Sequence, residues 1–256
     1  MQNTGQAVPP GPGRGAAGQG RGGAGQGRGG QRPSRGTIPP EFQAAQIEKM
    51  DVAELNQILK DPGASVFQKG KACHRLAQVG ARESVPLLAA LLTDQQLSHY
   101  ARFGLEAIPD PSVDDALRAA LPKVKGPLLV GVVNSIAARK DAKAVYALTK
   151  LLYGADPDVA QAAASALGYI GGPQSAKTIQ AGLARTKGPV RTAVAAAGLI
   201  SAEGLMADGD RKGALALYAA LSAPDIPKAA RMAALHAVID AESGLKRPRV
   251  TPPAPK

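Results

Sequence analysis

Residues 151–179 read LLYGADPDVAQAAASALGYIGGPQSAKTI, and the apolar residues in this stretch follow the spacing of an α-helix. We expect residues 157–169 to form one helix, because apolar side chains three and four positions apart lie on one helical face. Two glycines and a proline at 171–173 interrupt the pattern before it resumes at Ala176. The stretch therefore predicts two helices joined by a short turn.

The same pattern returns along the chain, which indicates an internal repeat. Each copy has four apolar positions spaced φxxφxxφφ, where φ is an apolar residue, and the first position of one copy is an acid instead. The copies close at Leu59, Leu92, Leu121, Leu152, Leu183 and Leu221. Successive copies are therefore 33, 29, 31, 31 and 38 residues apart, and the longest step contains the Gly-interrupted insertion EGLMADG at 203–209.

A second pair of similar segments supports the same repeat period. KGPLLVGVVNSI begins at Lys125 and KGPVRTAVAAAGLI begins at Lys187, which is 62 residues later, or twice 31. In each segment a proline suits the first position of a helix, where the missing N–H costs nothing. The run LLVGVV at 128–133 could also be a buried strand, but its place in the period favours a helix.

The repeat predicts an all-α fold, an α-solenoid of antiparallel helix hairpins. The copies of the apolar pattern form the second helix of each hairpin, and short loops with Gly and Pro join the helices. We expect the first helices at 65–78, 96–107, 127–138, 157–169, 189–202 and 227–240. The last of these has no second helix, so its Met232, Leu235 and Ile239 form either a docking edge or a frayed end.

The stretch at 151–179 also resembles a HEAT repeat, whose first helix typically reads D-P-x-V-x-x-x-A-A-x-A-L-G-x-I-G. The matching residues are Asp156, Pro157, Val159, Ala163, Ala164, Ala166, Leu167, Gly168, Ile170 and Gly171. The resemblance covers about residues 50–240 through one strong copy and several degenerate ones; in the copy that begins at Asp94, DQQL replaces DPxV. It implies a scaffold or binding surface whose second helices line the concave side, and it implies no reaction.

The charge of the chain is concentrated at its ends. The formal net charge is +11, of which residues 1–40 carry +5 and residues 244–256 carry +4, so the middle is nearly neutral. We expect three parts: a disordered arm rich in Gly, Arg, Gln and Pro at 1–40, the HEAT-like solenoid at 41–243, and a basic Pro-rich tail at 244–256. Neither end has enough apolar residues to offset the entropy of ordering its backbone.

No constellation in the sequence predicts a catalytic, cofactor or metal site. The G-x-G-x-x-G pattern in the arm lacks the strand and helix that a dinucleotide site needs. Cys73 and His74 are neighbours on one predicted helix, so their side chains diverge and are poorly placed to share a metal ion. The acids Asp110, Asp114 and Asp115 open a second helix, where carboxylates favour the free N–H groups, and we interpret them as capping residues.

The arm raises nucleic acid as an alternative partner. Its five arginines are Arg14, Arg21, Arg28, Arg32 and Arg35. Because residues 1–40 contain no aromatic residue on which a base could stack, the arm predicts weak, non-specific contact at most. We interpret it mainly as a flexible spacer.

If the concave face binds a partner, the contacts should follow one stripe of the second helices. That ladder is Asn56, Ala89, Arg118, Thr149, Gln180 and Tyr218, and the neighbouring row is Ala53, Pro86, Asp115, Tyr146, Lys177 and Leu215. Tyrosine and arginine are common interface anchors. The alternative is that these residues form ordinary solvated helix faces.

We therefore expect a non-enzymatic scaffold that binds a protein partner whose identity the sequence does not give. Two alternatives stay open: a weak nucleic-acid-binding protein that uses the basic tails, and an accessory module of an exported bacterial enzyme system. No apolar run approaches the roughly 20 residues that span a bilayer. As written, the chain is expected to be soluble and cytoplasmic, or periplasmic if a signal peptide has been removed.

Overall fold

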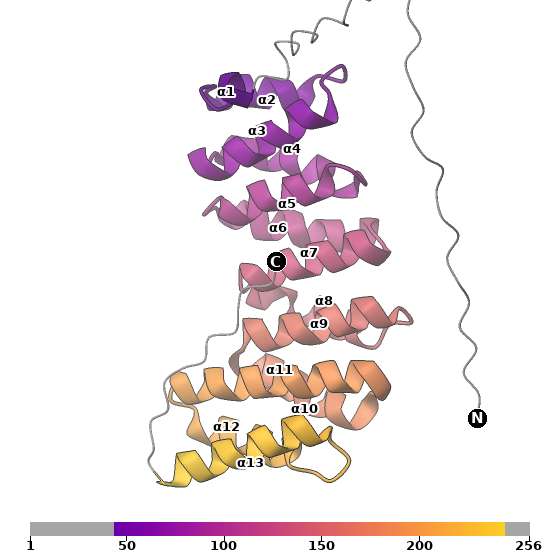
Figure 1. Ribbon diagram of the computed structural model, residues 1–256, viewed down its shortest axis with the longest axis vertical. Helices are drawn as coiled ribbons and strands as arrows, with labels where there is room; N and C mark the ends of the chain where they lie inside the picture. The colour runs from indigo at the N-terminus through magenta and orange to yellow at the C-terminus, as the bar shows by residue number, and fades with distance from the viewer. Residues whose placement is uncertain (1–43, 244–256) are drawn as a thin grey trace, which may run out of the picture. The chain divides into compact units, whose positions relative to one another are not determined.

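A computed structural model describes residues 44–243 of the chain, and this part is helical with no strand among its residues (Figure 1). The α-helices are α1 (Ala44–Ile47), α2 (Val52–Lys60), α3 (Val66–Val79), α4 (Val85–Ala90), α5 (Ser98–Ala107), α6 (Pro111–Ala120), α7 (Gly126–Ala138), α8 (Val145–Leu152), α9 (Pro157–Ile170), α10 (Gly172–Arg185), α11 (Gly188–Ala207), α12 (Arg211–Leu221) and α13 (Lys228–Ser243). Short 3-10 turns η2 (Arg82–Ser84), η3 (Leu91–Thr93), η4 (Leu121–Lys123) and η5 (Ala142–Ala144) adjoin α4, α6 and α8. The predicted arm at 1–40 and the predicted basic tail at 244–256 lie outside the described residues.

From α2 onward, successive helices alternate between two layers (Figure 1). In one layer α3, α5, α7, α9, α11 and α13 each contact the next. In the other layer α2 contacts α4, α4 contacts α6, α8 contacts α10, and α10 contacts α12. Each helix of the second layer also packs against the first-layer helix that follows it in the chain. This arrangement confirms the all-α solenoid predicted from the repeat, including its assignment of first and second helices.

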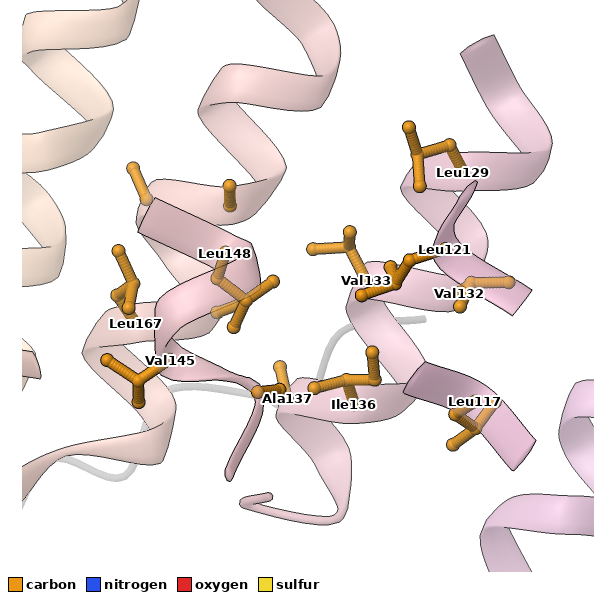
Figure 2. Packing of buried hydrophobic residues seen from close by; sticks show 14 of the residues in the cluster. Leu117, Leu121, Leu129, Val132, Val133, Ile136, Ala137, Val145, Leu148 and Leu167 are labelled. Atoms are coloured by element: carbon orange, nitrogen blue, oxygen red, sulfur yellow. The ribbon is translucent and has the colours of Figure 1, made fainter. Parts of the chain in front are cut away.

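The repeated apolar pattern forms the core between the layers. The closing leucines Leu59, Leu92, Leu121, Leu152, Leu183 and Leu221 are all buried. Figure 2 shows how one section of the core is built, with Leu117 and Leu121 beside the α7 side chains Val132, Val133 and Ile136, and with Leu148 beside Leu167. Fully burying one such side chain stabilises the fold by roughly 1.5–3 kcal/mol, so the core depends on this repeat.

Local signals in the sequence account for the helix ends. Asp51 and Ser65 are the N-caps of α2 and α3, and each forms a capping box. The cap side chain accepts from the backbone N–H of Glu54 or Gln68, and the side chain of that residue accepts from the backbone N–H of the cap. At the other end of α3, Gly80 has φ 64°, a left-handed conformation that glycine adopts without steric cost. Such caps satisfy the backbone groups that a helix leaves free at its ends.

The structure excludes the strand alternative and extends one predicted helix. Residues 128–133 lie within α7, so the strand alternative is wrong. The insertion at 203–209 was expected to follow a helix that ends at 202, but α11 continues without a break to Ala207. Gly204 does not stop the helix, because Ser201, Ala202 and Leu205 are buried in the stack and hold this turn in place.

Helix α11 was not recognised as a long apolar helix in the sequence. Its 20 residues are long and apolar enough to cross a membrane by length and composition, and among the described helices α11 alone meets both criteria. In the structure it contacts α9, α10, α12 and α13, and seven of its residues are buried. These contacts are those of a core helix in the stack.

Candidate protein-binding surface

The single cysteine and its neighbouring histidine do not form a reactive pair. Cys73 is fully buried in α3, and burial raises the pKa of its thiol to about 12. His74 is exposed and stacks on Phe103, with 5.1 Å between the ring centroids. Within residues 44–243 no group of three or more His, Cys, Asp or Glu side chains could hold a metal ion. A thiol held neutral by burial is a poor nucleophile.

The acidic cluster at the start of α6 divides into one cap and two ion-pairing residues. Asp110 is the N-cap of α6, and its Oδ1 accepts from the Ser112 backbone N–H at 2.9 Å. The hydrogen bonds from Ser112 hold the pKa of the Asp110 carboxyl below its usual value. Asp114 instead pairs with Arg139, and Asp115 pairs with Arg118. The capping interpretation therefore holds for Asp110 only.

Two members of the predicted ladder lie in the core. Asn56 is 8% exposed, and its Oδ1 accepts a hydrogen bond from Ser84 Oγ at 2.7 Å. Tyr218 is 4% exposed, and burial, reinforced by the charge of Glu203, raises its pKa to about 12. Both positions point toward neighbouring helices instead of solvent. Asn56 and Tyr218 are therefore not part of the exposed surface, contrary to the prediction from the sequence.

Two further members of the ladder connect neighbouring elements. Arg118 on α6 forms ion pairs with Asp115 on its own helix and with the buried Asp141 of the next repeat. Thr149 Oγ1 donates to the carbonyl of Val145 at 2.7 Å and lies 3.4 Å from Thr178 Oγ1 on α10. These polar groups already have partners, so they mainly hold the second layer together.

Three predicted residues remain at the surface of the second layer. Tyr146 on α8 is 73% exposed, and the Lys150 ammonium lies 4.5 Å from the centroid of its ring. Lys177 and Gln180 are exposed on α10, the next helix of this layer. Tyr146 has the largest exposed fraction among the exposed large hydrophobic residues of the described chain.

A groove lies on the same layer between the starts of α4 and α6. Its volume is about 620 Å³, and it is lined by Arg82, Glu83, Val85, Pro86, Ser112 and Ala116. Pro86 belongs to the row predicted from the sequence, and it is exposed in the groove. Near the same place Arg82 Nε lies 3.5 Å from Asp110 Oδ2. The second layer thus offers an apolar recess with charged residues at its edge.

A second exposed cluster, on the first layer, was missed in the sequence. Phe67 on α3 and Tyr100 and Phe103 on α5 are 38%, 42% and 47% exposed, and His74 stacks on Phe103. The signal was present, because Phe67 and Tyr100 are 33 residues apart and so occupy equivalent positions in successive repeats. The basic arm, with Arg14, Arg21, Arg28, Arg32 and Arg35, lies outside the described residues.

The match to a family model agrees with this architecture. A family model of HEAT repeats matches residues 127–200, which extend from α7 into α11. The crystal structure of an engineered protein is similar to 76% of this chain and to 98% of its own, with 21% sequence identity and a TM-score of 0.46. A search of curated proteins gives no match. The chain is an α-helical repeat protein, and its residues 127–200 are similar to HEAT repeats, which commonly mediate protein–protein interaction.

Proposed function

We propose that this protein is a non-enzymatic scaffold that binds a protein partner on the face formed by its second helices. The observation that carries this proposal is the 73% exposure of the Tyr146 ring. The chain contains only eight aromatic residues among its 256. A tyrosine ring left in solvent by a protein so poor in aromatics is a candidate interface anchor, because tyrosine is enriched among the residues that dominate binding energy.

The second layer has other exposed features besides the Tyr146 ring. The groove beside Pro86 lies between α4 and α6, while Tyr146 projects from α8 and Lys177 and Gln180 from α10. A partner that crosses these helices would place an apolar side chain in the groove and pack another against the tyrosine. Because Arg118 pairs with Asp141 of the next repeat and Thr149 Oγ1 lies 3.4 Å from Thr178 Oγ1 on α10, we expect them to hold the surface in shape and not to supply binding energy.

Site-specific photocrosslinking tests the surface directly. A crosslinking amino acid is placed at Tyr146, at Pro86 or, as a control, at Ala196, which is exposed on the first-layer helix α11. We expect the two second-layer positions to capture the same protein and the control position not to capture it. Equal capture at all three positions, or capture of nucleic acid in place of protein, would contradict the proposal.

The captured partner then allows a quantitative test. Tyr146→Ala should weaken its binding by roughly tenfold or more, because truncating a tyrosine anchor costs about 2 kcal/mol. The matched control is Phe67→Ala, which removes an exposed ring from the first layer. If Phe67→Ala weakens binding and Tyr146→Ala does not, the binding face is the aromatic cluster of the first layer and the proposal is wrong.

A further inference from the structure

The last described helix, α13, exposes an apolar stripe. Met232, Leu235 and Ile239 are 41%, 40% and 59% exposed, and their spacing of three and four puts them on one face of the helix. Every earlier first-layer helix from α3 to α11 packs against the next helix of its layer. α13, drawn in yellow at the end of the stack in Figure 1, contacts α11 and α12 on its other side. Among the described residues, no helix covers the stripe.

Opposite charges lie at the two ends of this stripe. Lys228 is exposed in the first turn of α13, and Glu242 is exposed in its last turn. The two charges lie on the same face of the helix as the apolar stripe, because the spacing along positions 228, 232, 235, 239 and 242 is four, three, four and three residues. Both are placed against the helix macrodipole, which favours acids at the first turn and bases at the last. Their arrangement suits a partner better than it suits the helix itself.

We propose that this stripe is a self-association surface on which a second copy of the chain packs its own α13 in the antiparallel direction. A two-fold axis near Leu235 places that residue against its counterpart in the other copy. The same axis places Met232 of one copy beside Ile239 of the other, and Lys228 of each copy beside Glu242 of the other. A two-fold interface requires such a self-complementary surface.

Small side chains beside the stripe permit close packing of the two helices. Ala229 and Ala233 are both exposed on α13. Antiparallel pairing also brings the positive end of one helix dipole beside the negative end of the other, so Lys228 approaches the C-terminal end of the other α13 and Glu242 its N-terminal end. Parallel pairing would instead bring lysine against lysine and glutamate against glutamate.

The chain segment that follows α13 is a poor alternative occupant. Residues 244–256 contain four prolines and four cations, with Leu245 and Val250 as their large apolar residues. A sequence of this kind lacks the apolar stripe that a covering helix needs. A second copy supplies that stripe together with the complementary charges.

The strength of association is limited by the size of one helix pair. Such a contact buries less than the roughly 1,200 Å² that stable complexes need, so we expect a dissociation constant on the order of 1–100 µM. Sedimentation of the full chain across that range should show a monomer–dimer equilibrium with no larger species. A monomer throughout, or species that keep growing with concentration as in head-to-tail stacking, would overturn the proposal.

Charge reversal distinguishes this geometry from other modes of association. Lys228→Glu and Glu242→Lys should each weaken dimerisation by roughly tenfold, because each creates two like-charge contacts across the axis. The double variant exchanges the two charges and should restore most of the wild-type affinity. Single variants that dimerise like the wild type, or a double variant that is weaker than either one, would contradict antiparallel pairing.

A disulfide test does not depend on any loss of stability. Leu235→Cys should form a symmetric disulfide under mild oxidation, because the axis passes near that side chain. The native Cys73 is buried and should not compete. Ala196→Cys, exposed on α11, is the control and should form no intermolecular disulfide. Crosslinking of the control as fast as Leu235→Cys would show random collision and would count against the proposed axis.

Discussion

Arg139, at the C-terminal end of α7, donates a hydrogen bond from Nη1 to the carbonyl oxygen of Ile108 at 2.8 Å. The same guanidinium donates to the carbonyls of Glu106 at 3.3 Å and Asp110 at 3.2 Å, and it pairs with the Asp114 carboxylate. One side chain therefore donates to three backbone carbonyls at the turn between α5 and α6. It joins that turn to the following repeat.

Arg139→Met should lower the free energy of unfolding by about 2–4 kcal/mol, because it removes a charged donor shared by three carbonyls and leaves the Asp114 carboxylate without its ion-pair partner in a partly buried site. Arg139→Lys should recover only part of this loss, since an ammonium cannot donate in several fixed directions at once. Urea denaturation followed by circular dichroism measures both. Lys143→Met, at an exposed position in η5, is the control and should change stability by less than about 0.5 kcal/mol.

Lys140 is the only residue other than glycine with positive φ among residues 44–243, with φ 54°. A left-handed backbone costs a residue with a Cβ roughly 1 kcal/mol, and glycine avoids this cost. Lys140→Gly should therefore leave the melting temperature unchanged or raise it by a few degrees, whereas Lys140→Val should lower it. Equal melting temperatures for the two variants would show that this turn is not constrained as described.

The fold was predicted well because its signal is local and repeated. A spacing of three and four residues determines which face of a helix is apolar, and the closing leucines that define the period are all buried. The length of α11 was not predicted, because glycines at 204 and 209 mark a turn in sequence while tertiary packing keeps the helix intact up to Ala207.

The candidate surface was predicted less well, since exposure of a polar or aromatic residue depends on neighbouring repeats. Asn56 can be buried because Ser84, 28 residues away, donates a hydrogen bond to its side chain. Tyr218 occupies the same register position but lies near Glu203 of the extended α11. By contrast, the exposed Phe67 and Tyr100 are related by the period itself, so the sequence could have identified them.

Two helical glycines provide a matched pair for testing how tightly the first layer packs. A Cβ at Gly168 in α9 would lie 2.9 Å from the Cα and the carbonyl oxygen of Ala197 in α11, while a Cβ at Gly204 would meet nothing within 4 Å. Gly168→Ala should therefore destabilise the protein by about 1–3 kcal/mol through overpacking. Gly204→Ala should stabilise it by up to about 1 kcal/mol through helix propensity. Thermal unfolding of both variants should give shifts of opposite sign.

The burial of Tyr218 predicts a loss of stability in alkaline solution. Its pKa rises from 10.0 to about 12 in the folded protein, so between these pH values the unfolded chain releases this proton and the folded chain retains it. Rising pH therefore lowers the free energy of the unfolded state relative to the folded state, and stability falls with a slope of at most about 1.4 kcal/mol per pH unit from this group. Tyr218→Phe removes this contribution and should be more resistant than the wild type between pH 10 and 12 in denaturant titrations.

The buried thiol of Cys73 contributes a loss of the same sign that begins near pH 9 and is unaffected by this change. Tyr146→Phe removes a hydroxyl from an exposed ring, and its profile should follow the wild type; a Tyr218→Phe profile that did the same would show that the side chain is solvated in the folded state.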